Sequence, residues 1–297
     1  MKNLSKEIET LRSSKNSHHL LDEMWAYKPF ARKMQELDVS YEESQAQLPM
    51  LSRFYESMKY CDTSCPGLEA CDSPMPHYVC QLSRNDLNQL ELTTGPCVLF
   101  AKAEAIRSNM IFHDVPDEWM ESSEQPSLRS KELFQTAGAL VTSDTKKKWV
   151  LVNGNPGSGK SCVSFLVAKF LAAPPFNQTV AFIDVRKRFD ELKGEAIKDR
   201  AAFERDMKKL TDVDILFLDA FGDEYKNDYT RDQVLMPLLS ARSNRKAPTF
   251  FLSSFTLDEI RQLYATSMNA KILANKMTKL IEANLLKRVV ITERFDI

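Results

Sequence analysis

The sequence predicts an α/β fold: a parallel five-stranded sheet flanked by helices, preceded by a small helical N-terminal domain that binds a metal. A glycine-rich loop at residues 154–161 lies between an apolar, strand-like run and a helical pattern. From residue 128 onward such runs alternate with helical patterns, which is typical of a parallel sheet covered by helices. Cysteines cluster before residue 107. We therefore expect an N-terminal domain at 1–107, a linker at 108–127 and a second domain at 128–297.

Composition and charge limit the classes of function. The 297 residues are 43% hydrophobic with a formal net charge of −1, so the overall charge does not favour nucleic acid or a membrane surface. No apolar run is long enough to span a bilayer, and the polar residues 1–9 lack the apolar core of a signal peptide. We expect a cytoplasmic protein, and in a reducing compartment clustered cysteines favour a metal site over disulfides.

The N-terminal residues carry apolar side chains at helical spacing. Leu4, Ile8 and Leu11 form one stripe. A second stripe follows Pro49, a residue suited to the first turn of a helix, and consists of Leu48, Leu51, Phe54, Tyr55 and Met58. Such stripes indicate either packing within the domain or a docking face for a partner.

Residues 61–97 gather side chains that bind metals: Cys61, Cys65, Cys71, His77, Cys80 and Cys97. Structural zinc takes four such ligands in a tetrahedron. Cys61 and Cys65 form a close pair. His77 and Cys97 flank a predicted hairpin, with strands at 78–82 and 90–93 and a turn at Asn85-Asp86. We predict that zinc is bound by Cys61, Cys65, His77 and Cys97, with Cys71 and Cys80 as alternates.

Further along the chain, a helix is expected at 98–107, and residues 108–127 show no clear periodicity, which is typical of a linker. Strands are predicted at 149–153, 179–185, 214–219, 248–253 and 288–292, with helices in most of the gaps.

The loop Gly154-Asn155-Pro156-Gly157-Ser158-Gly159-Lys160-Ser161 matches the phosphate-binding pattern G-x-x-x-x-G-K-[ST] at every fixed position. Its glycines let backbone N–H groups face a phosphate, and the helix that follows adds its positive dipole end. Lys160 would reach the β- and γ-phosphates, and the Ser161 hydroxyl would complete a Mg²⁺ shell. We expect these residues, with Cys162 at the start of the helix, to bind ATP and magnesium.

A second motif is the apolar run that ends in Asp219, a Walker B pattern whose carboxylate helps to hold Mg²⁺. ATPases of the AAA+ type carry a second acid directly afterwards to orient the attacking water. Here that position is Ala220, and loss of a general base costs on the order of 10²–10⁴-fold in rate. Asp223 or Glu224 could substitute only if the loop folds back.

The next predicted strand ends in Ser253 and Ser254, where AAA+ proteins sense the γ-phosphate. Either hydroxyl could act as this sensor. The alternative is that both serines begin the loop before a helix, which residues 256–259 open with a capping-box pattern.

Together these features resemble the DnaI/DnaC-type helicase loaders, a family of AAA+ ATPases, over nearly the full length of the chain. The specific stretches are LFLDAFGDE at 216–224, TRDQVL at 230–235 and PTFFLSSF at 248–255. The resemblance implies a loader that places the replicative hexameric helicase on DNA. Its N-terminal part would contact the helicase, and its ATPase part would bind nucleotide and single-stranded DNA and self-associate in an ATP-dependent way.

The chain departs from the family pattern on the hydrolysis side of the site. Ala220 replaces the second acid, Ser254 stands where the sensor asparagine is expected, and Lys279 lies near the arginine-finger position. Lysine cannot reproduce the planar fork of a guanidinium. Arg294 is the candidate for the second sensor. The candidate catalytic residues are therefore Asp219, Ser254 and Lys279, and we expect weak or absent hydrolysis. The alternatives are a non-catalytic P-loop adaptor and a transposition-type ATPase helper; the predicted zinc module argues against the latter.

Overall fold

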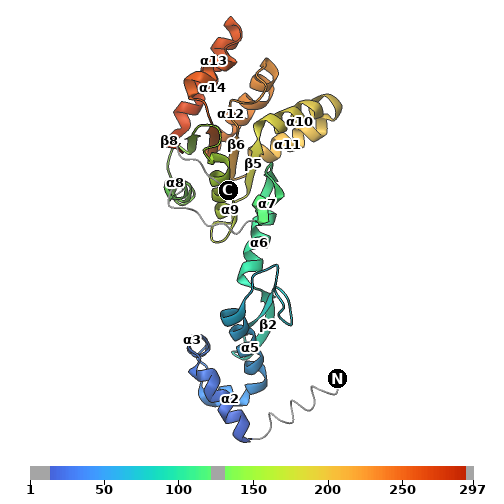
Figure 1. Cartoon of the computed structure of the whole chain (residues 1–297), viewed down its shortest axis with the longest axis vertical. Coiled ribbons are helices and arrows are strands. Elements are labelled where there is room, and N and C mark those ends of the chain that lie inside the picture. The colour runs from blue at the N-terminus through green and yellow to red at the C-terminus, as the bar shows by residue number, and fades with distance from the viewer. Residues whose placement is uncertain (1–13, 122–130, 292–297) are drawn as a thin grey trace. The chain divides into compact units, whose positions relative to one another are not determined.

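The computed structural model describes residues 14–121 and 131–291 and divides the chain into two compact units, Met1–Lys102 and Ala103–Ile297 (Figure 1). The stripe of Leu4, Ile8 and Leu11, the end of the predicted linker and Arg294 lie outside the described residues. None of the described helices combines the length and the apolar character that crossing a membrane requires.

The first unit is a small helical bundle with one hairpin. Its elements are α2 (Ser14–Ala26), α3 (Lys28–Glu36), α4 (Tyr41–Ala46), α5 (Leu48–Ser64), β1 (Tyr78–Arg84) and β2 (Leu90–Pro96). Pro49 lies in the first turn of α5, as predicted. Leu51, Phe54 and Tyr55 are buried against side chains of the other helices. The second stripe therefore packs inside this unit and is not a free docking face.

The predicted hairpin is confirmed by the antiparallel register of β1 and β2, which runs from Tyr78 opposite Pro96 to Arg84 opposite Leu90. At the turn, the Asn85 side chain accepts hydrogen bonds from the backbone N–H groups of Leu87 and Gln89, both at 3.0 Å. An asparagine that bonds its own turn in this way explains the sequence signal.

The second unit contains a parallel sheet with the strand order β3-β5-β6-β7-β4-β8. Its strands are β3 (Met110–His113), β4 (Trp149–Asn153), β5 (Val180–Asp184), β6 (Ile215–Asp219), β7 (Thr249–Ser253) and β8 (Leu285–Val290). The sheet thus has six strands where the sequence predicted five. The additional strand, β3, and helix α7 (Asp117–Glu121) fall within the predicted linker. A strand of four residues is too short to show a periodicity, which explains the error.

Helices cover both faces of this sheet. They are α6 (Val98–Asn109), which begins in the first unit, α8 (Lys131–Thr142), α9 (Lys160–Ala172), α10 (Val185–Lys198), α11 (Arg200–Asp212), the π-helix η2 (Thr230–Leu235), α12 (Met236–Asn244), α13 (Leu257–Tyr264) and α14 (Met268–Asn284).

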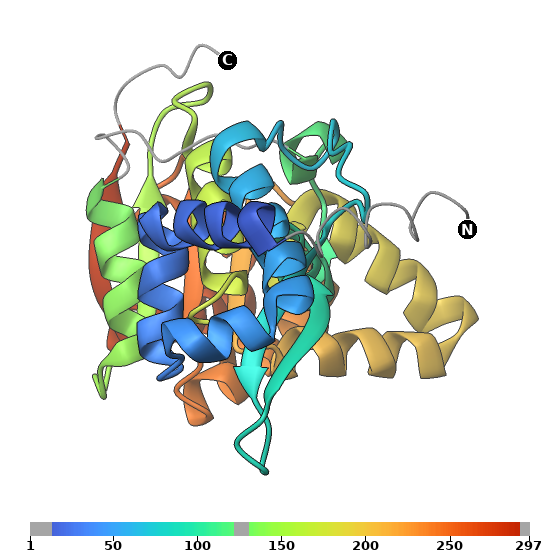
Figure 2. The ribbon, with the colours of Figure 1, turned by 90° about the horizontal axis from the view of Figure 1, so that it is seen from below.

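Side-chain alternation along the strands assigns the helices to the two faces. Val150 and Val152 of β4 face α8 and α9, whereas Trp149 and Leu151 belong to the core shared with α10 to α14. Helices α10 and α11 contact each other and extend to one side of the sheet (Figure 1 and Figure 2). Since all paired strands are parallel, the carboxyl ends of β4, β5, β6 and β7 meet at one edge of the sheet. This is the edge where ligands bind in such folds.

Candidate nucleotide-binding site

The glycine-rich loop lies at this edge, between β4 and α9. Gly157 and Gly159 have φ angles of 78° and 80°, in the left-handed region that favours glycine. A Cβ at Gly154 would lie 2.4 Å from the Ile291 carbonyl oxygen and 2.6 Å from the Ser158 hydroxyl. The loop therefore needs its glycines for its backbone conformation and for close packing.

Lys160 begins α9 and reaches across the loop. Its Nζ donates to the Asn155 carbonyl at 3.3 Å and to the Ser254 hydroxyl at 3.0 Å. Burial lowers the pKa of Lys160, and the carboxylates of Asp219 and Asp223 act in the opposite direction. Among the described residues, this ammonium donates hydrogen bonds only to neutral oxygens. A buried ammonium with neutral partners is suited to bind an anion such as a phosphate.

The Ser161 hydroxyl and Asp219 form the second contact of the site. The hydroxyl donates to Asp219 Oδ1 at 2.8 Å, and the same oxygen accepts the Ala220 N–H at 2.9 Å. Burial raises the pKa of Asp219, and nearby Asp184 adds to this in a smaller degree. A hydroxyl and a carboxylate are hard oxygen ligands of the kind that Mg²⁺ prefers.

The polar atoms of the loop also suit a phosphate group. The buried Ser158 hydroxyl has no hydrogen-bond partner within the described parts of the chain. A buried hydroxyl without a partner costs free energy unless a ligand or water satisfies it. The glycine turn, the Lys160 ammonium and this hydroxyl belong to one loop, so the residues present fit a bound triphosphate.

Asp184 is a site residue that the sequence analysis missed. It ends β5 directly opposite Asp219 of β6 in the strand register. Its carboxylate accepts the Arg186 N–H at 2.9 Å and pairs with the Arg186 guanidinium at 2.6 Å. An acid at the end of the predicted strand 179–185 was the available signal, because it repeats the Walker B pattern on the neighbouring strand.

The turn after Asp219 contacts Ser253, the last residue of β7, and not Ser254, which follows the strand. Phe221 N–H donates to the Leu252 carbonyl at 2.8 Å, and the Ser253 hydroxyl donates to the Phe221 carbonyl at 2.6 Å. Ser253 is fully buried in this structural role, so Ser254 is the serine that meets Lys160. The predicted capping box of α13 is present, with hydrogen bonds between Thr256 and Glu259 in both directions.

Glu224 does not face the loop. It is 1% exposed. One carboxylate oxygen accepts the Gly222 N–H at 2.7 Å, and the other accepts the Tyr264 hydroxyl. Burial raises the pKa of Glu224. Asp223 and Glu224 are the two candidates to replace the acid absent at position 220. Glu224 is buried in the core with both carboxylate oxygens hydrogen-bonded, whereas Asp223 is exposed.

The remaining predicted residues lie on helices. Cys162 is buried in the first turn of α9. Lys279 lies on the exposed side of α14. An arginine-finger position acts on a neighbouring subunit, so its place within one chain does not assign it a role.

The cysteine cluster lies in the first unit around a cavity of about 400 Å³ whose lining includes Cys61, Cys65, Cys71, His77, Cys80 and Cys97. All of these cysteines are free thiols. Within the described ranges, no group of three or more His, Cys, Asp or Glu side chains is arranged to hold a metal ion. The predicted ligand set is therefore not assembled.

His77 is the member that departs most clearly from the prediction. Its Nε2 lies 2.9 Å from the Leu68 carbonyl oxygen, and its ring stacks on Phe100 at 5.0 Å between centroids. By contrast, the Cys71 pKa is lowered by backbone hydrogen bonds from His77 and Ser73. Such bonds favour a thiolate, the form that binds metals.

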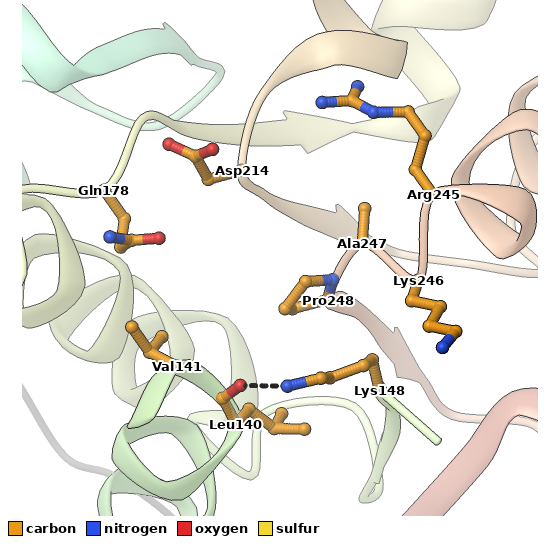
Figure 3. A pocket seen from close by; sticks show the side chains of 9 residues that line it. All are labelled: Leu140, Val141, Lys148, Gln178, Asp214, Arg245, Lys246, Ala247 and Pro248. Atoms are coloured by element: carbon orange, nitrogen blue, oxygen red, sulfur yellow. Dashed lines mark hydrogen bonds between the residues drawn. The ribbon is translucent and has the colours of Figure 1, made fainter. Parts of the chain in front are cut away.

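A second cavity, of about 240 Å³, lies at the opposite edge of the sheet, where the strands begin (Figure 3). Its lining includes Lys148, Arg245 and Lys246, and the first two donate hydrogen bonds to main-chain carbonyls. Lys148 donates to the Leu140 carbonyl at 2.7 Å and to the Ser143 carbonyl at 2.6 Å, and Arg245 donates to the Asp212 carbonyl at 3.0 Å. Lys148 and Arg245 thus bond main-chain carbonyls at this edge, whereas the phosphate-binding loop lies at the opposite edge of the sheet.

Comparison with known proteins agrees with this geometry. No protein-family model matches the chain. The replicative helicase loader DnaI of Bacillus subtilis is 27% identical over 139 residues, which are 46% of this chain and 43% of the relative. The match thus spans less than half of that relative's length. A crystal structure of DnaI is 22% identical, covers 63% of this chain and 96% of its own, and has a TM-score of 0.50.

A crystal structure of the DnaC helicase loader is 18% identical, covers 59% of this chain and 99% of its own, and has a TM-score of 0.46. The strand order of the sheet, the phosphate-binding loop and the sequence match to DnaI all indicate the same fold. The chain has an AAA+ fold and is similar to the helicase loaders of the DnaI/DnaC type.

Proposed function

We propose that this chain binds ATP with magnesium and acts as a nucleotide-dependent switch with weak or absent hydrolysis. The observation that carries the proposal is the pair of contacts at the phosphate loop: Ser161 with Asp219, and Lys160 with Ser254. Residues 154–161 would hold the phosphates, and Ser161 and Asp219 would hold the metal. When bound, Mg²⁺ would neutralise negative charge on the phosphate oxygens.

We further propose that the switch serves the loading of a replicative hexameric helicase during replication, in the cytoplasm. Similarity to a protein named replicative helicase loader supports this role. The first unit would dock on the helicase, and the second would bind single-stranded DNA and self-associate when ATP is bound. A non-catalytic adaptor is the second candidate, favoured by Ala220 at the position of the second acid.

The test is the variant Lys160→Ala, with Lys146→Ala as its matched control, because Lys146 is an exposed lysine before β4 at the other edge of the sheet. Lys160→Ala should lose ATP binding in a titration and lose delivery of the helicase to single-stranded DNA, while the control keeps both. If Lys160→Ala fails to bind ATP but still delivers the helicase, the switch is wrong and the adaptor is right.

We also propose that the first unit binds zinc through Cys61, Cys65 and Cys97, with either Cys71 or His77 as the fourth ligand. These residues line one cavity, and burial there raises the pKa of Cys61. Thiolate and imidazole are ligand types that zinc prefers, and a tetrahedral zinc shell supplies folding free energy to small domains. Side-chain rotation about this cavity would be needed to bring the ligands together.

Metal analysis of the purified chain tests this part, with about one zinc per chain expected. Cys97→Ser should lose the metal, and Cys162→Ser, which alters a cysteine of the second unit, should keep it. Comparing Cys71→Ser with His77→Ala identifies the fourth ligand. A wild-type chain without zinc would contradict the proposal.

A further inference from the structure

The turn that follows Asp219 reverses the chain at the nucleotide site. Ala220 has a φ of 55° and Gly222 a φ of 94°, both in the left-handed region. The Asp223 N–H closes the turn on the Ala220 carbonyl at 2.8 Å. Phe221 anchors the turn to β7 through both its N–H and its carbonyl. The loop therefore folds back, which is the condition under which Asp223 could replace the missing acid.

Asp223 lies on the turn that directly follows Asp219, and its charge favours the protonated form of both cations of the site. Burial lowers the pKa of Lys160, and Asp219 and Asp223 oppose this. The bond to Asp184 is the main cause that raises the pKa of Arg186, and Asp223 and Asp219 add to it. Lys160 follows β4, Arg186 follows β5 and Asp223 follows β6, so all three belong to the edge of the sheet where the carboxyl ends of these parallel strands meet.

Asp223 is also available to bind water. Its carboxylate is exposed, and no hydrogen bond or ion pair of that carboxylate is found in the part of the chain that the structure describes. The neighbouring acids already have partners. Asp184 pairs with Arg186, Asp219 accepts a hydrogen bond from the Ser161 hydroxyl, and Glu224 accepts one from the Tyr264 hydroxyl.

We propose that Asp223 orients and deprotonates the water that attacks ATP in this chain, in place of the acid that Ala220 lacks. The assignment rests on the proposed binding of ATP. The water oxygen forms a bond to the γ-phosphorus while the bond from that phosphorus to the β–γ bridging oxygen breaks, and ADP leaves with the electron pair. The water proton passes to the Asp223 carboxylate, which then releases it to solvent. Because Asp223 is on a turn and not at the strand end, turnover is slow but present.

The experiment compares Asp223→Asn with Asp144→Asn, which removes the same charge from an exposed site before β4, at the other edge of the sheet. Single-turnover hydrolysis of ATP should fall about 100-fold or more in Asp223→Asn, the loss typical of a missing general base. The nucleotide that stays bound after gel filtration should shift from ADP to ATP in this variant. Its ATP affinity should equal or exceed that of the wild type, since a like charge near the phosphates is removed. Asp144→Asn should match the wild type in all three readouts.

A second variant tests whether the two positions serve the same water. Aspartate tolerates the left-handed conformation at position 220 better than most residues do. Ala220→Asp combined with Asp223→Asn should regain turnover, and a double variant as slow as Asp223→Asn would contradict the shared role.

Three outcomes separate this assignment from the proposed function. A wild-type chain that binds ATP but never cleaves it, or an Asp223→Asn variant that cleaves it at the wild-type rate, overturns the role of Asp223 alone. A wild-type chain that does not bind ATP overturns the proposed nucleotide switch and the assignment with it.

Discussion

Replacing Arg242 should destabilise the second unit more than any other single surface or core arginine that the structure describes. Arg242 lies on α12 and is fully buried. Burial lowers its pKa to about 9, so the guanidinium is still charged at neutral pH. Its donors reach Thr249 Oγ1 at 2.9 Å and the carbonyl oxygens of Leu210 at 3.1 Å, Thr211 at 3.2 Å, Val213 at 2.9 Å, Asp214 at 3.3 Å and Pro248 at 2.6 Å.

The loss of unfolding free energy in the variant Arg242→Met follows from the carbonyls that lose their hydrogen bonds. A hydrogen bond contributes about 1 kcal/mol net, and more when the donor is charged, so the five N–H groups of the guanidinium together contribute roughly 5 kcal/mol or more. The cost of burying the guanidinium offsets part of that sum. Methionine fills the space but donates nothing to the carbonyls at the end of α11. We expect a loss of about 3–5 kcal/mol, a large share of the roughly 5–15 kcal/mol that stabilises a typical domain.

Urea unfolding measures this loss, and Arg245→Met is its matched control. Arg245 lies three residues further along, is 43% exposed and pairs with Asp212 at 3.1 Å, so its loss should cost about 1 kcal/mol or less. Since the chain has two compact units, only the transition of the second one should shift. If Arg242→Met unfolds within about 1 kcal/mol of Arg245→Met, the reasoning from buried hydrogen bonds is refuted.

Two further predictions concern the turn after Asp219. Ala220→Gly should stabilise the protein by up to about 1 kcal/mol in urea unfolding. The left-handed conformation at φ 55° costs an alanine about 1–2 kcal/mol, and the greater conformational entropy of glycine in the unfolded chain offsets part of the gain. A clear loss of stability would contradict the claim that Ala220 is strained. Glu224→Gln should change the pH dependence of stability. Burial raises the pKa of Glu224 above its ordinary value of 4.5, so the folded state binds more protons than the unfolded one above that pH, and the contribution of Glu224 falls as pH rises. The free energy of unfolding of both proteins should be measured from about pH 4.5 to about pH 8. The wild type should lose stability relative to Glu224→Gln as pH rises, and parallel curves of stability against pH would rule this out.

The regular part of the fold could be read from the sequence because each feature has a local cause. The strand before the phosphate loop is apolar from Trp149 to Val152, since both of its faces are buried under helices. The hairpin follows from Asn85, whose side chain bonds its own turn. The capping box at Thr256 likewise depends only on neighbouring residues. Such signals are complete within a short window of sequence.

The features that the sequence could not provide depend on tertiary contacts. Strand β3 is defined by its pairing with β5, not by a pattern of its own. Asp223 and Glu224 are adjacent acids, yet one is exposed and the other is buried against Tyr264, 40 residues away. His77 has the right chemistry for zinc, but the Leu68 carbonyl and the Phe100 ring determine its orientation. Residue type alone does not distinguish these outcomes.

The two halves of the nucleotide site depend on different parts of the fold, and this bears on how a switch could operate. The cradle is fixed by the glycine loop, the start of α9 and the end of β6. The cleavage side depends on one turn, where position 220 has a left-handed backbone but no acid. A rate loss of about 10²–10⁴-fold corresponds to roughly 3–5 kcal/mol of transition-state stabilisation and leaves ground-state binding intact. The lifetime of the proposed ATP-bound state would therefore be set by residues 220 and 223, independently of the affinity set by the loop.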